Sequence, residues 1–595
     1  MTATLLLNET TASTPQEIAP PKRLALRNGY LLPVASGLLL WASFFVPILV
    51  WVALIPLGLL IPREGTRLHI YLGAWLGGFV FFLLGTYWVS YCADWVWIGW
   101  VCLSAFLALY FAAFVFVSRV CYRRWNVPLL VTVPLIWVAL EYVRMYLLSG
   151  FGWLLLAHSV YQWERVIQIA DLAGVYGVSF VIAVANAALL ELLCTPLFVA
   201  GPNGMQLNSP LEWRLAFAGL IVFLNVGYGQ YRIAEAKFRP GPRVVVVQTN
   251  VPQDMKNGDS KSTEVFRDIW DIVRPATEVD ADLVVWPETS YPFMYGVHEK
   301  GMSNMEISRK YTQRMAVPGK PYHEAPTDEM GDIIHLNFKD GDEHTEAMAR
   351  MLSKPMLLGT SFWDVKLSGA KYTNASVLIV PGPGRVGTYH KIHILPFGEY
   401  IPFDGNIPLL RVFIPYPADF NFDSDAGEKV ESLHYGSLNL APLICFEDTL
   451  PDLSRAYLRS ATKEKPVDIL VNQSNDGWFD NSIEGDYHLA ASLFRSVEVR
   501  RPMIRSSNTG PSALIDGNGR IVKAFEKDGK RQGVEGFFTA EVPLDDRSSW
   551  YVQFGDWLPQ LGLLLGGGCL LLSGIRQMVN IRRTWNENLK PKSTA

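Results

Sequence analysis

Hydrophobic positions gather in long uninterrupted stretches near the two ends of the chain, and these stretches predict membrane-spanning helices. A helix needs about 20 mainly apolar residues to cross a bilayer. Residues 29–61 carry no charge, but at about 1.5 Å per residue they are too long for one straight span. Two short helices, near 29–44 and 46–61, are therefore expected to pack there as a hairpin. Six further spans are predicted at residues 70–93, 95–118, 125–140, 172–190, 215–231 and 557–575. The pattern predicts a polytopic α-helical membrane protein with eight spans.

The charges between these stretches predict their orientation, because cytoplasmic loops collect Lys and Arg. Basic residues precede the first span, follow the second and fourth spans, and follow the last one; they are Lys22, Arg23, Arg27, Arg63, Arg67, Arg119, Arg123, Arg124, Arg576, Arg582, Arg583, Lys590 and Lys592. A signal peptide also joins basic residues to an apolar run, but this run is longer and more spans follow it. The expected parts are a cytoplasmic tail at 1–28, seven spans within 29–231, an extracytoplasmic domain at 232–556, an eighth span at 557–577 and a basic cytoplasmic tail at 578–595.

The region between the last two spans has the pattern of an α/β domain. Short β-branched runs predict strands at Arg243–Gln248, Leu283–Trp286, Met356–Thr360, Ser376–Val380, Leu440–Cys445, Asp468–Asn472 and Met503–Ser506. Helical patterns lie between some of them, at Lys261–Val273, Ser454–Ala461 and Tyr487–Val499. Several strands end in polar residues, and ligand sites in open α/β sheets lie at the carboxyl ends of strands. Segment 297–350 is rich in charge and poor in apolar runs, so it is interpreted as a long insertion with a helix near Glu343–Leu352.

Composition narrows the class of protein. Half of the 595 residues are hydrophobic and 18% are charged, against roughly 25% charged residues in a soluble domain. This excludes an ordinary soluble enzyme, a disordered chain and a secreted disulfide scaffold. The net charge of −4 gives no electrostatic case for nucleic acid as a partner. The sequence shows no Gly-rich phosphate loop and no CxxC or HExxH spacing, so neither a cofactor nor a metal is predicted.

Cys445 is the single cysteine of the expected outer domain. A domain that relies on disulfides would contain an even number of cysteines. A lone thiol in an oxidising compartment is therefore either packed in the core as a small hydrophobe or used chemically. This fact alone leaves both interpretations open.

Three motifs contain residue types that together support acyl transfer. Glu288 ends a hydrophobic strand, Lys391 follows Tyr389-His390, and Cys445 ends another strand. A carboxylate can take the proton of a thiol, and an ammonium group can lower the thiol pKa and stabilise an oxyanion. The three residues lie far apart in sequence, so spacing does not establish that they meet. A surface Glu, a surface Lys and a core Cys remain the alternatives.

Taken together, these motifs resemble the carbon–nitrogen hydrolase (nitrilase) superfamily, which carries a Glu–Lys–Cys triad in an αββα sandwich. With eight spans around such a domain, the chain is similar from about residue 29 to 577 to the membrane-bound bacterial apolipoprotein N-acyltransferases. Supporting segments are Trp137–Gly152, Asn472–Phe479, Arg500–Gly510 and Gly555–Trp557. The resemblance implies that Glu288 is the general base, Lys391 the oxyanion-stabilising lysine and Cys445 the nucleophile. It further implies supporting carboxylates at Glu399 and Glu447, and an oxyanion-hole N–H at Phe446.

The activity that the resemblance implies is ping-pong acyl transfer. A phospholipid would acylate the cysteine, and the N-terminal amine of the diacylglyceryl-cysteine of an apolipoprotein would receive the acyl group. The partners would be the phospholipid donor, the diacylated apolipoprotein and the lipid bilayer. The location would be the bacterial cytoplasmic (inner) membrane, with the catalytic domain on the periplasmic side. A membrane-tethered amidase, and a transporter or receptor with a degenerate binding domain, are the alternatives.

Several aromatic residues suit a lipid substrate. Trp478 and Phe479 are expected to shape an acyl pocket. Tyr291 and Phe293 lie in an apolar stretch interpreted as a loop that faces the bilayer or a lipid entry path, as do residues 409–416. Ordinary core or loop packing is the alternative for all of them. Two positions depart from the family pattern: Phe446 replaces the usual Tyr, and Asn257 stands where an aromatic residue is expected.

Overall fold

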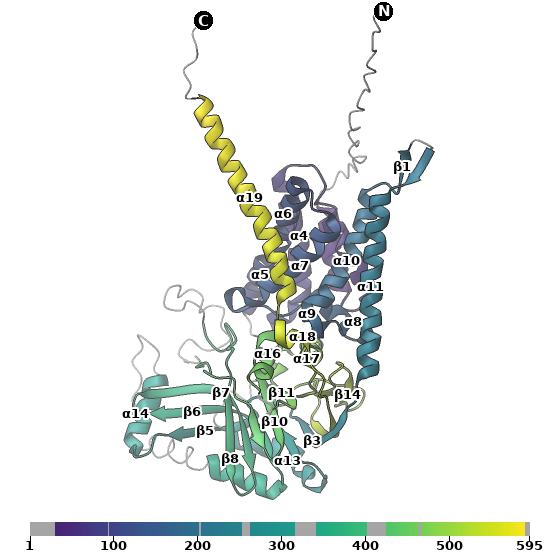
Figure 1. The fold of residues 1–595 in the computed structure, drawn as a ribbon. Coiled ribbons are helices and arrows are strands. Elements are labelled where there is room, and N and C mark those ends of the chain that lie inside the picture. The colour runs from purple at the N-terminus through teal and green to yellow at the C-terminus, as the bar shows by residue number, and fades with distance from the viewer. Residues whose placement is uncertain are drawn as a thin grey trace, which may run out of the picture.

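The computed structural model describes residues 30–92, 95–201, 204–252, 262–315, 341–401, 424–461 and 466–588. A bundle of apolar helices stands on a domain built from two β-sheets (Figure 1). Helix α19, drawn in yellow, leaves the sheet domain and runs along the bundle to its far end (Figure 1). The chain enters the sheet domain from the long helix α11 (Ser209–Glu235) and leaves it into α19 (Trp557–Asn588).

Six helices of the described residues are long and apolar enough to cross a membrane, which supports a membrane protein. Five of them are α4 (Arg67–Gly85), α7 (Leu129–Tyr146), α10 (Val175–Cys194), α11 and α19. The sixth is the continuous helical run Val96–Trp125, which consists of α5 (Val96–Leu107) and α6 (Leu109–Trp125). The first predicted hairpin is present as the shorter helix α1 (Leu31–Ala42) and the helical run Pro47–Gly58. The number of eight spans therefore stays a prediction. Helix α19 also continues to Asn588, so the first part of the predicted C-terminal tail is helical.

Glycines allow the first helix to pack closely on its neighbour. A Cβ on Gly37 of α1 would lie 2.2 Å from the carbonyl oxygen of Gly77 in α4, and one on Gly77 would lie 2.3 Å from the carbonyl oxygen of Pro33. Small residues are what lets helix backbones approach in a membrane. A short helix such as α1 is thus held by backbone contact with a long one.

The sheet domain contains two sheets. One has the order β15-β3-β4-β6-β7-β8, with β5 paired to β6, and the other has the order β14-β13-β12-β11-β10-β9. The strands are β3 (Arg239–Gln248), β4 (Leu283–Val285), β5 (Tyr291–His298), β6 (Met356–Lys366), β7 (Gly369–Val380), β8 (Gly384–His390), β9 (Leu433–Tyr435), β10 (Leu438–Ile444), β11 (Ile469–Ser474), β12 (Met503–Ser507), β13 (Ala513–Ile515), β14 (Ile521–Ala524) and β15 (Gly536–Leu544). A further hairpin, β1 (Phe198–Gly201) with β2 (Gly204–Leu207), lies between α10 and α11.

The two sheets pack face to face and helices cover their outer faces. Val244 and Val246 of β3 belong to the core shared with the second sheet, whereas Val245 and Val247 belong to a core with α13 (Ser262–Val273). Both faces of the strand are buried, which explains why it reads as a continuous apolar run. A helix over residues 341–352 joins the same outer layer, and α16 (Pro451–Ser460) and α17 (Glu484–Val499) cover the second sheet. The αββα arrangement is confirmed.

Two local predictions need correction or completion. The stretch at Tyr291–Tyr295 is not a loop: it begins strand β5, which pairs in parallel with β6. Tyr291 is buried in the core beside α13 because its ring packs against Phe266. The 297–350 insertion contains α14 (Asn304–Met315) and the start of the helix over 341–352. Residues 316–340, 409–416 and Asn257 lie outside the described residues.

A buried ionic network joins the helical bundle to the sheet domain. Asp171 of α9 (Ala170–Ala173) accepts hydrogen bonds from Tyr228 and Arg232 of α11, at 2.7 Å each. Arg500, which follows α17, donates to the same carboxylate from Nη2 at 2.7 Å and from Nε at 2.9 Å. Asp171 and Arg500 are fully buried. A buried carboxylate that accepts from two arginines holds the three segments in one arrangement.

Candidate active site

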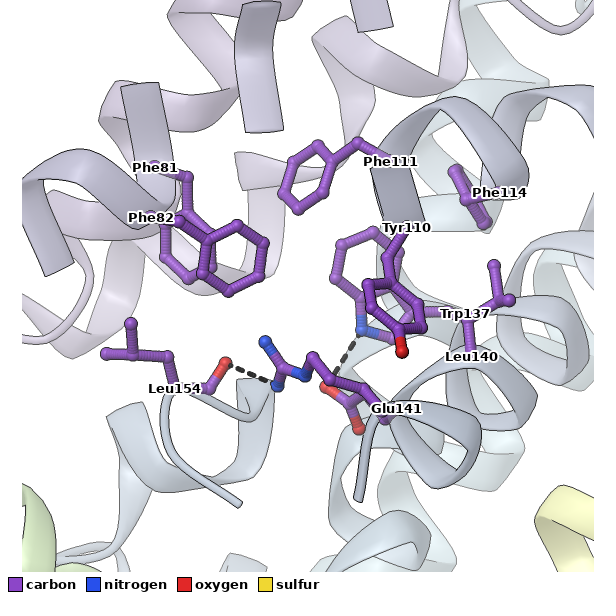
Figure 2. Close-up of a pocket in the computed structure, with 10 residues that line it drawn as sticks. Phe81, Phe82, Tyr110, Phe111, Phe114, Trp137, Leu140, Glu141 and Leu154 are labelled. Carbon is purple, nitrogen blue, oxygen red and sulfur yellow. Dashed lines mark hydrogen bonds between the residues drawn. The ribbon is translucent and has the colours of Figure 1, made fainter. Parts of the chain in front are cut away.

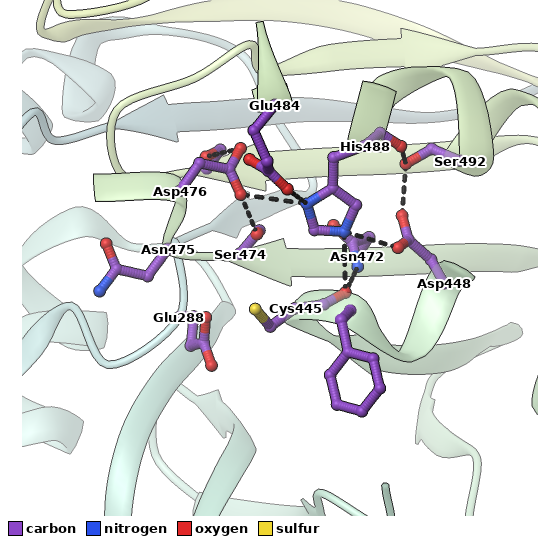
Figure 3. A network of polar contacts seen from close by, with 12 residues as sticks. Glu288, Cys445, Asp448, Asn472, Ser474, Asn475, Asp476, Glu484, His488 and Ser492 are labelled. Carbon is purple, nitrogen blue, oxygen red and sulfur yellow. Dashed lines mark hydrogen bonds and ion pairs between the residues drawn. The ribbon is translucent and has the colours of Figure 1, made fainter. Parts of the chain in front are cut away.

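The predicted triad residues come together where strands of both sheets end. Glu288 follows β4, Lys391 follows β8, and Cys445 follows β10. The Lys391 ammonium lies 3.5 Å from Glu288 Oε1, and the Cys445 sulfur lies on the Glu288 side of its turn (Figure 3). Glu288 and Lys391 are 5% and 1% exposed, so neither is a surface residue. The surface alternatives for these two residues are therefore wrong.

Lys391 lies among acceptors that keep it charged. Its Nζ donates to Glu399 Oε1 at 2.9 Å, and Asn374 Nδ2 donates to both Glu288 Oε1 (2.6 Å) and Glu399 Oε1 (3.2 Å). Burial opposes the charged form, but the carboxylates of Glu399 and Glu288 outweigh it and hold the pKa of Lys391 above its ordinary value. The Nζ also lies 5.5 Å from the centre of the Phe446 ring. A permanent cation therefore stands beside the cysteine turn.

Cys445 occupies a strained turn that presents its thiol to the carboxylates. Its φ of +55° lies in the left-handed region, which a residue with a side chain rarely adopts. Such strain persists only where the surroundings impose it, and it clusters at functional sites. Burial and the Glu288 carboxylate hold the pKa of the thiol well above its ordinary value, although Lys391 opposes them. The resting thiol is therefore protonated, and a base is needed to activate it.

Glu447 ties the lysine loop to the cysteine turn. Its Oε1 accepts from the backbone N–H groups of Ile392 at 2.8 Å and His393 at 3.0 Å, directly after Lys391. Its Oε2 accepts from the N–H of Ile444 at 2.7 Å, directly before Cys445, and the Tyr389 hydroxyl donates to both oxygens. Burial raises the pKa of Glu447, and the N–H donors oppose that rise. The carboxylate thus fixes the backbone on both sides of the site.

A buried polar network behind Cys445 centres on His488, a residue outside the predicted site (Figure 3). His488 Nε2 lies 2.7 Å from Asp448 Oδ1 and 3.2 Å from the carbonyl oxygen of Cys445, while Nδ1 lies 3.1 Å from Asp476 Oδ1. Arg505 Nη2 donates to Asp476 Oδ2 at 2.7 Å. Burial and Arg505 lower the pKa of His488, but Asp448 and Asp476 outweigh them and raise it to about 10. The imidazolium therefore donates toward the cysteine carbonyl.

The same network contains the one group of potential metal ligands found among the described residues. Ligand atoms of Asp476, Glu484 and His488 lie within 4.8 Å of one another. Asp476 already accepts from Arg505 and from Ser474, so protein groups occupy part of its coordination capacity. The sequence signal that could have revealed the network is the row Glu484, His488 and Ser492, because positions four apart share one helix face.

The helical bundle contributes aromatic side chains to the site. Trp153 stacks on Phe446 with ring centres 6.4 Å apart, and Trp88 meets Phe479 edge-on at 4.8 Å. The segment that carries Trp153 is anchored from α7: Glu141 Oε1 accepts from the Leu156 N–H at 3.0 Å. Figure 2 shows a small aromatic pocket of the bundle in which Trp137 donates to Glu141. Arg144, on the same helix as Glu141, donates to the carbonyl oxygen of Leu154 in the pocket wall. The apolar helices and the turn that carries Cys445 thus form one packed unit.

The predicted substrate-binding residues fall into two groups. Phe479 and Trp478 lie half-buried in the turn Asp476–Phe479 that follows β11, and Phe479 contacts the membrane bundle through Trp88. Phe293 and Tyr291 lie in β5 and pack against Phe266 of α13. Contact of any of these four residues with substrate stays a prediction.

An αββα sandwich with a buried lysine and a cysteine at its strand ends is the fold of a carbon–nitrogen hydrolase, and residues 243–551 match the family model of that description. Residues 36–188 match the model described as apolipoprotein N-acyltransferase N-terminal domain. The chain belongs to the apolipoprotein N-acyltransferase family.

Curated relatives named apolipoprotein N-acyltransferase align with nearly the whole chain. The relative from Geobacter metallireducens is 30% identical over 89% of this chain and 92% of its own length. The one from Rhodopirellula baltica is 26% identical over 88% of this chain and 93% of its own length. The one from Pseudomonas aeruginosa is 28% identical over 91% and 95%. The similarity therefore includes the helical bundle as well as the sheet domain.

Proposed function

We propose that this protein transfers a fatty acyl group from a membrane phospholipid, through a thioester on Cys445, to the N-terminal amine of the diacylglyceryl-cysteine of apolipoproteins. The observation that carries the proposal is the convergence of Glu288, Lys391 and Cys445 in a sandwich packed onto membrane helices. Family membership supports lipoprotein N-acylation as the outcome.

In the first half-reaction the Cys445 sulfur attacks the carbonyl carbon of a phospholipid ester. The Glu288 carboxylate takes the thiol proton, which the raised thiol pKa makes necessary, and passes it to the leaving alcohol oxygen of the lysophospholipid. The Lys391 ammonium and the N–H of Phe446 stabilise the oxyanion. Lys391 forms ion pairs with both Glu399 and Glu288. The pair with Glu399 keeps the lysine charged while Glu288 gains and loses its proton.

In the second half-reaction the α-amine of the apolipoprotein attacks the thioester carbonyl. Glu288 takes a proton from the amine, the C–S bond breaks, and the proton returns to sulfur as the amide forms. Glu447 acts as a positioning residue, because it bonds the backbone beside Lys391 and beside Cys445. His488 has the same kind of role through the Cys445 carbonyl.

The aromatic contacts between bundle and catalytic turn support a lipid substrate. Trp478 and Phe479 would border the acyl chain, with Trp88 and Trp153 of the bundle beside them. We further propose that eight segments cross the bacterial inner membrane, that the sheet domain is periplasmic, and that the parts have the boundaries predicted from the sequence. The Arg residues at the end of the bundle opposite the sheet domain support this orientation.

Intact mass spectrometry of the purified protein after incubation with phosphatidylethanolamine tests the mechanism. We expect a fatty-acyl mass increment that hydroxylamine removes and that a diacylated lipopeptide discharges as a triacylated product. Cys445→Ala should show no increment, whereas Cys102→Ala, which removes an exposed cysteine of the bundle, should behave as the parent protein. Folded protein that gains no acyl group from any phospholipid would overturn the proposal. Hydrolysis of soluble amides by residues 243–545 alone would favour the amidase alternative.

A further inference from the structure

The end of the helical bundle farthest from the catalytic domain contains a basic cavity. Arg67 at the start of α4, Arg124 near the end of α6 and Arg576 of α19 line a cavity of about 730 Å³. Trp125, Ser573 and Trp585 are also in its wall. The three arginines come from three helices that are remote in sequence, so tertiary structure alone brings them together.

Among the described residues, the arginines of this cavity differ from their basic neighbours because no protein group accepts a hydrogen bond from them. Arg119 donates to the carbonyl oxygens of Leu60 and Arg63, and Arg123 lies 3.9 Å from Glu64. Within the part of the chain that the structure describes, no carboxylate pairs with Arg67, Arg124 or Arg576. Three like charges around one cavity create a positive potential that favours an anionic ligand.

The wall of the cavity is held in place by specific contacts. Trp125 Nε1 donates to the carbonyl oxygen of Cys569 and to Ser573 Oγ, at 3.0 Å each, which fastens α6 to α19. The guanidinium of Arg576 lies 5.8 Å above the Trp125 ring. An arginine stacked on a fixed indole keeps its N–H groups directed to a ligand rather than sweeping through solvent.

Apolar surface leads away from the cavity along α19. Leu571, Leu572 and Ile575 precede Arg576 in the helix, on the side of the sheet domain, and are between 43% and 66% exposed. In a bilayer these side chains contact acyl chains, while the arginines lie at the level of the headgroups. The cavity therefore offers guanidinium groups to a phosphate and an apolar path to the tails of the same molecule.

We propose that this cavity binds the headgroup of an anionic phospholipid from the leaflet opposite the catalytic domain, which is the cytoplasmic leaflet in the topology proposed above. The guanidinium groups would bind the phosphate oxygens, and the acyl chains would lie along α19. Arginine forms paired hydrogen bonds with phosphate, and basic pockets between spans on the cytoplasmic side suit such headgroups. This lipid is distinct from the acyl donor, because the catalytic cysteine lies at the other end of the bundle.

Native mass spectrometry of the full-length protein in detergent tests the proposal. The Cys445→Ala variant serves as the parent, so that acyl transfer cannot alter the masses and binding is scored independently of the proposed activity. The protein is titrated with phosphatidylglycerol, cardiolipin, phosphatidylethanolamine and inorganic phosphate. We expect phosphatidylglycerol or cardiolipin to bind in addition to any lipid held at the catalytic site, and we expect inorganic phosphate to remain unbound at the same concentrations.

Matched variants assign the binding to the cavity. Arg124→Gln with Arg576→Gln should weaken anionic lipid binding about 30-fold, and each single change about 5-fold. The control pair, Arg123→Gln with Arg582→Gln, removes the same charge from the same two helices outside the cavity and should bind as the parent. Equal weakening in both pairs, an equal loss of phosphatidylethanolamine binding in Arg124→Gln with Arg576→Gln, or binding of phosphate alone would each overturn the proposal. The single changes keep the test valid if the double variant fails to fold.

Discussion

Single side chains decide whether the thiol can react. The cysteine turn has a positive φ at Cys445 and is held by the Glu447 carboxylate on one side and the His488 imidazolium on the other. Both side chains are fully buried, and each makes several hydrogen bonds. Removing one partner of a buried polar contact leaves the remaining groups unsatisfied, which costs more than the bond contributes.

We expect Glu447→Gln to lower both stability and activity. An amide must place its NH2 group against at least one of the N–H donors of Ile392, His393 and Ile444. The free energy of unfolding should fall by about 1–3 kcal/mol. Thermal unfolding in detergent and the rate of acyl-enzyme formation measure the effect. Glu431→Gln, at an exposed position of the same domain, is the control and should change neither.

The His488 network should make stability depend on pH. The pKa of His488 is raised to about 10 in the folded protein, against an ordinary value near 6.5. The imidazolium therefore stabilises the fold fully below about pH 6.5, and this contribution disappears as the pH rises through 10. Burial and Asp476 also raise the pKa of Glu484 to about 8. This raised pKa likewise makes the free energy of unfolding fall as the pH rises, but between about 4.5 and 8.

Between pH 8 and 10, the free energy of unfolding of the parent protein should fall by about 1.4 kcal/mol per pH unit because of His488. In His488→Asn this fall should be absent. Unfolding curves of parent and variant at several pH values measure this slope. Parallel pH profiles in the two proteins would contradict the assignment of the charge to His488.

Single elements position these residues through backbone contact. Strand β6 contains Gly359 beside the turn that follows β4, and a Cβ there would lie 2.2 Å from the Pro287 carbonyl oxygen and 2.8 Å from the Glu288 Cα. No side chain fits at such a distance, so the glycine is what allows Glu288 to approach Lys391. The position of Glu288, the proposed base, therefore depends on the backbone of a neighbouring strand.

Gly359→Ala should displace the Glu288 backbone and reduce acyl-enzyme formation. A misplacement of about 1 Å at a reacting group can lower a rate about 100-fold. Single-turnover mass spectrometry measures the rate, and unfolding measurements separate it from loss of structure. Gly567→Ala provides the control, because a Cβ at Gly567 in α19 would meet no atom within 4 Å and its backbone is helical. A variant that acylates at the parent rate would show that the close approach is dispensable.

The molecule as a whole depends on the joint between its helical bundle and its sheet domain. Asp171 accepts from Arg232 of the bundle and Arg500 of the sheet domain, in a site closed to solvent. A buried ion pair contributes little compared with an apolar replacement, but breaking one partner alone leaves an uncompensated charge.

Asp171→Asn should destabilise the protein by about 3–5 kcal/mol, because the fully buried Arg500 loses its carboxylate. Thermal unfolding of the full-length protein in detergent measures the loss. Glu164→Gln, which removes the exposed partner of Arg520 in the same region, should cost little. Similar losses in both variants would contradict a special role for the buried joint.

Hydrophobic patterning was sufficient to predict the apolar helices and the layered α/β domain. The apolar runs at Val244–Val247 and in α10 are visible in the local sequence, and their side chains are buried as such runs predict. Helix α19 continues to Asn588, beyond the predicted membrane boundary at 577, because a helix can extend past its apolar segment. The run at Tyr291–Tyr295 was wrongly predicted as a loop, because its pairing with β6 is not visible in local sequence.

The sequence determined which residue types are available for chemistry, since Glu288, Lys391 and Cys445 each lie in a recognisable local motif. Only the tertiary structure decided that they meet, because they come from strands of two different sheets. It also decided the roles of His488 and Asp171, whose partners lie on separate elements. Contacts between distant segments depend on how whole layers pack, and that information is spread over the entire core rather than carried by any motif.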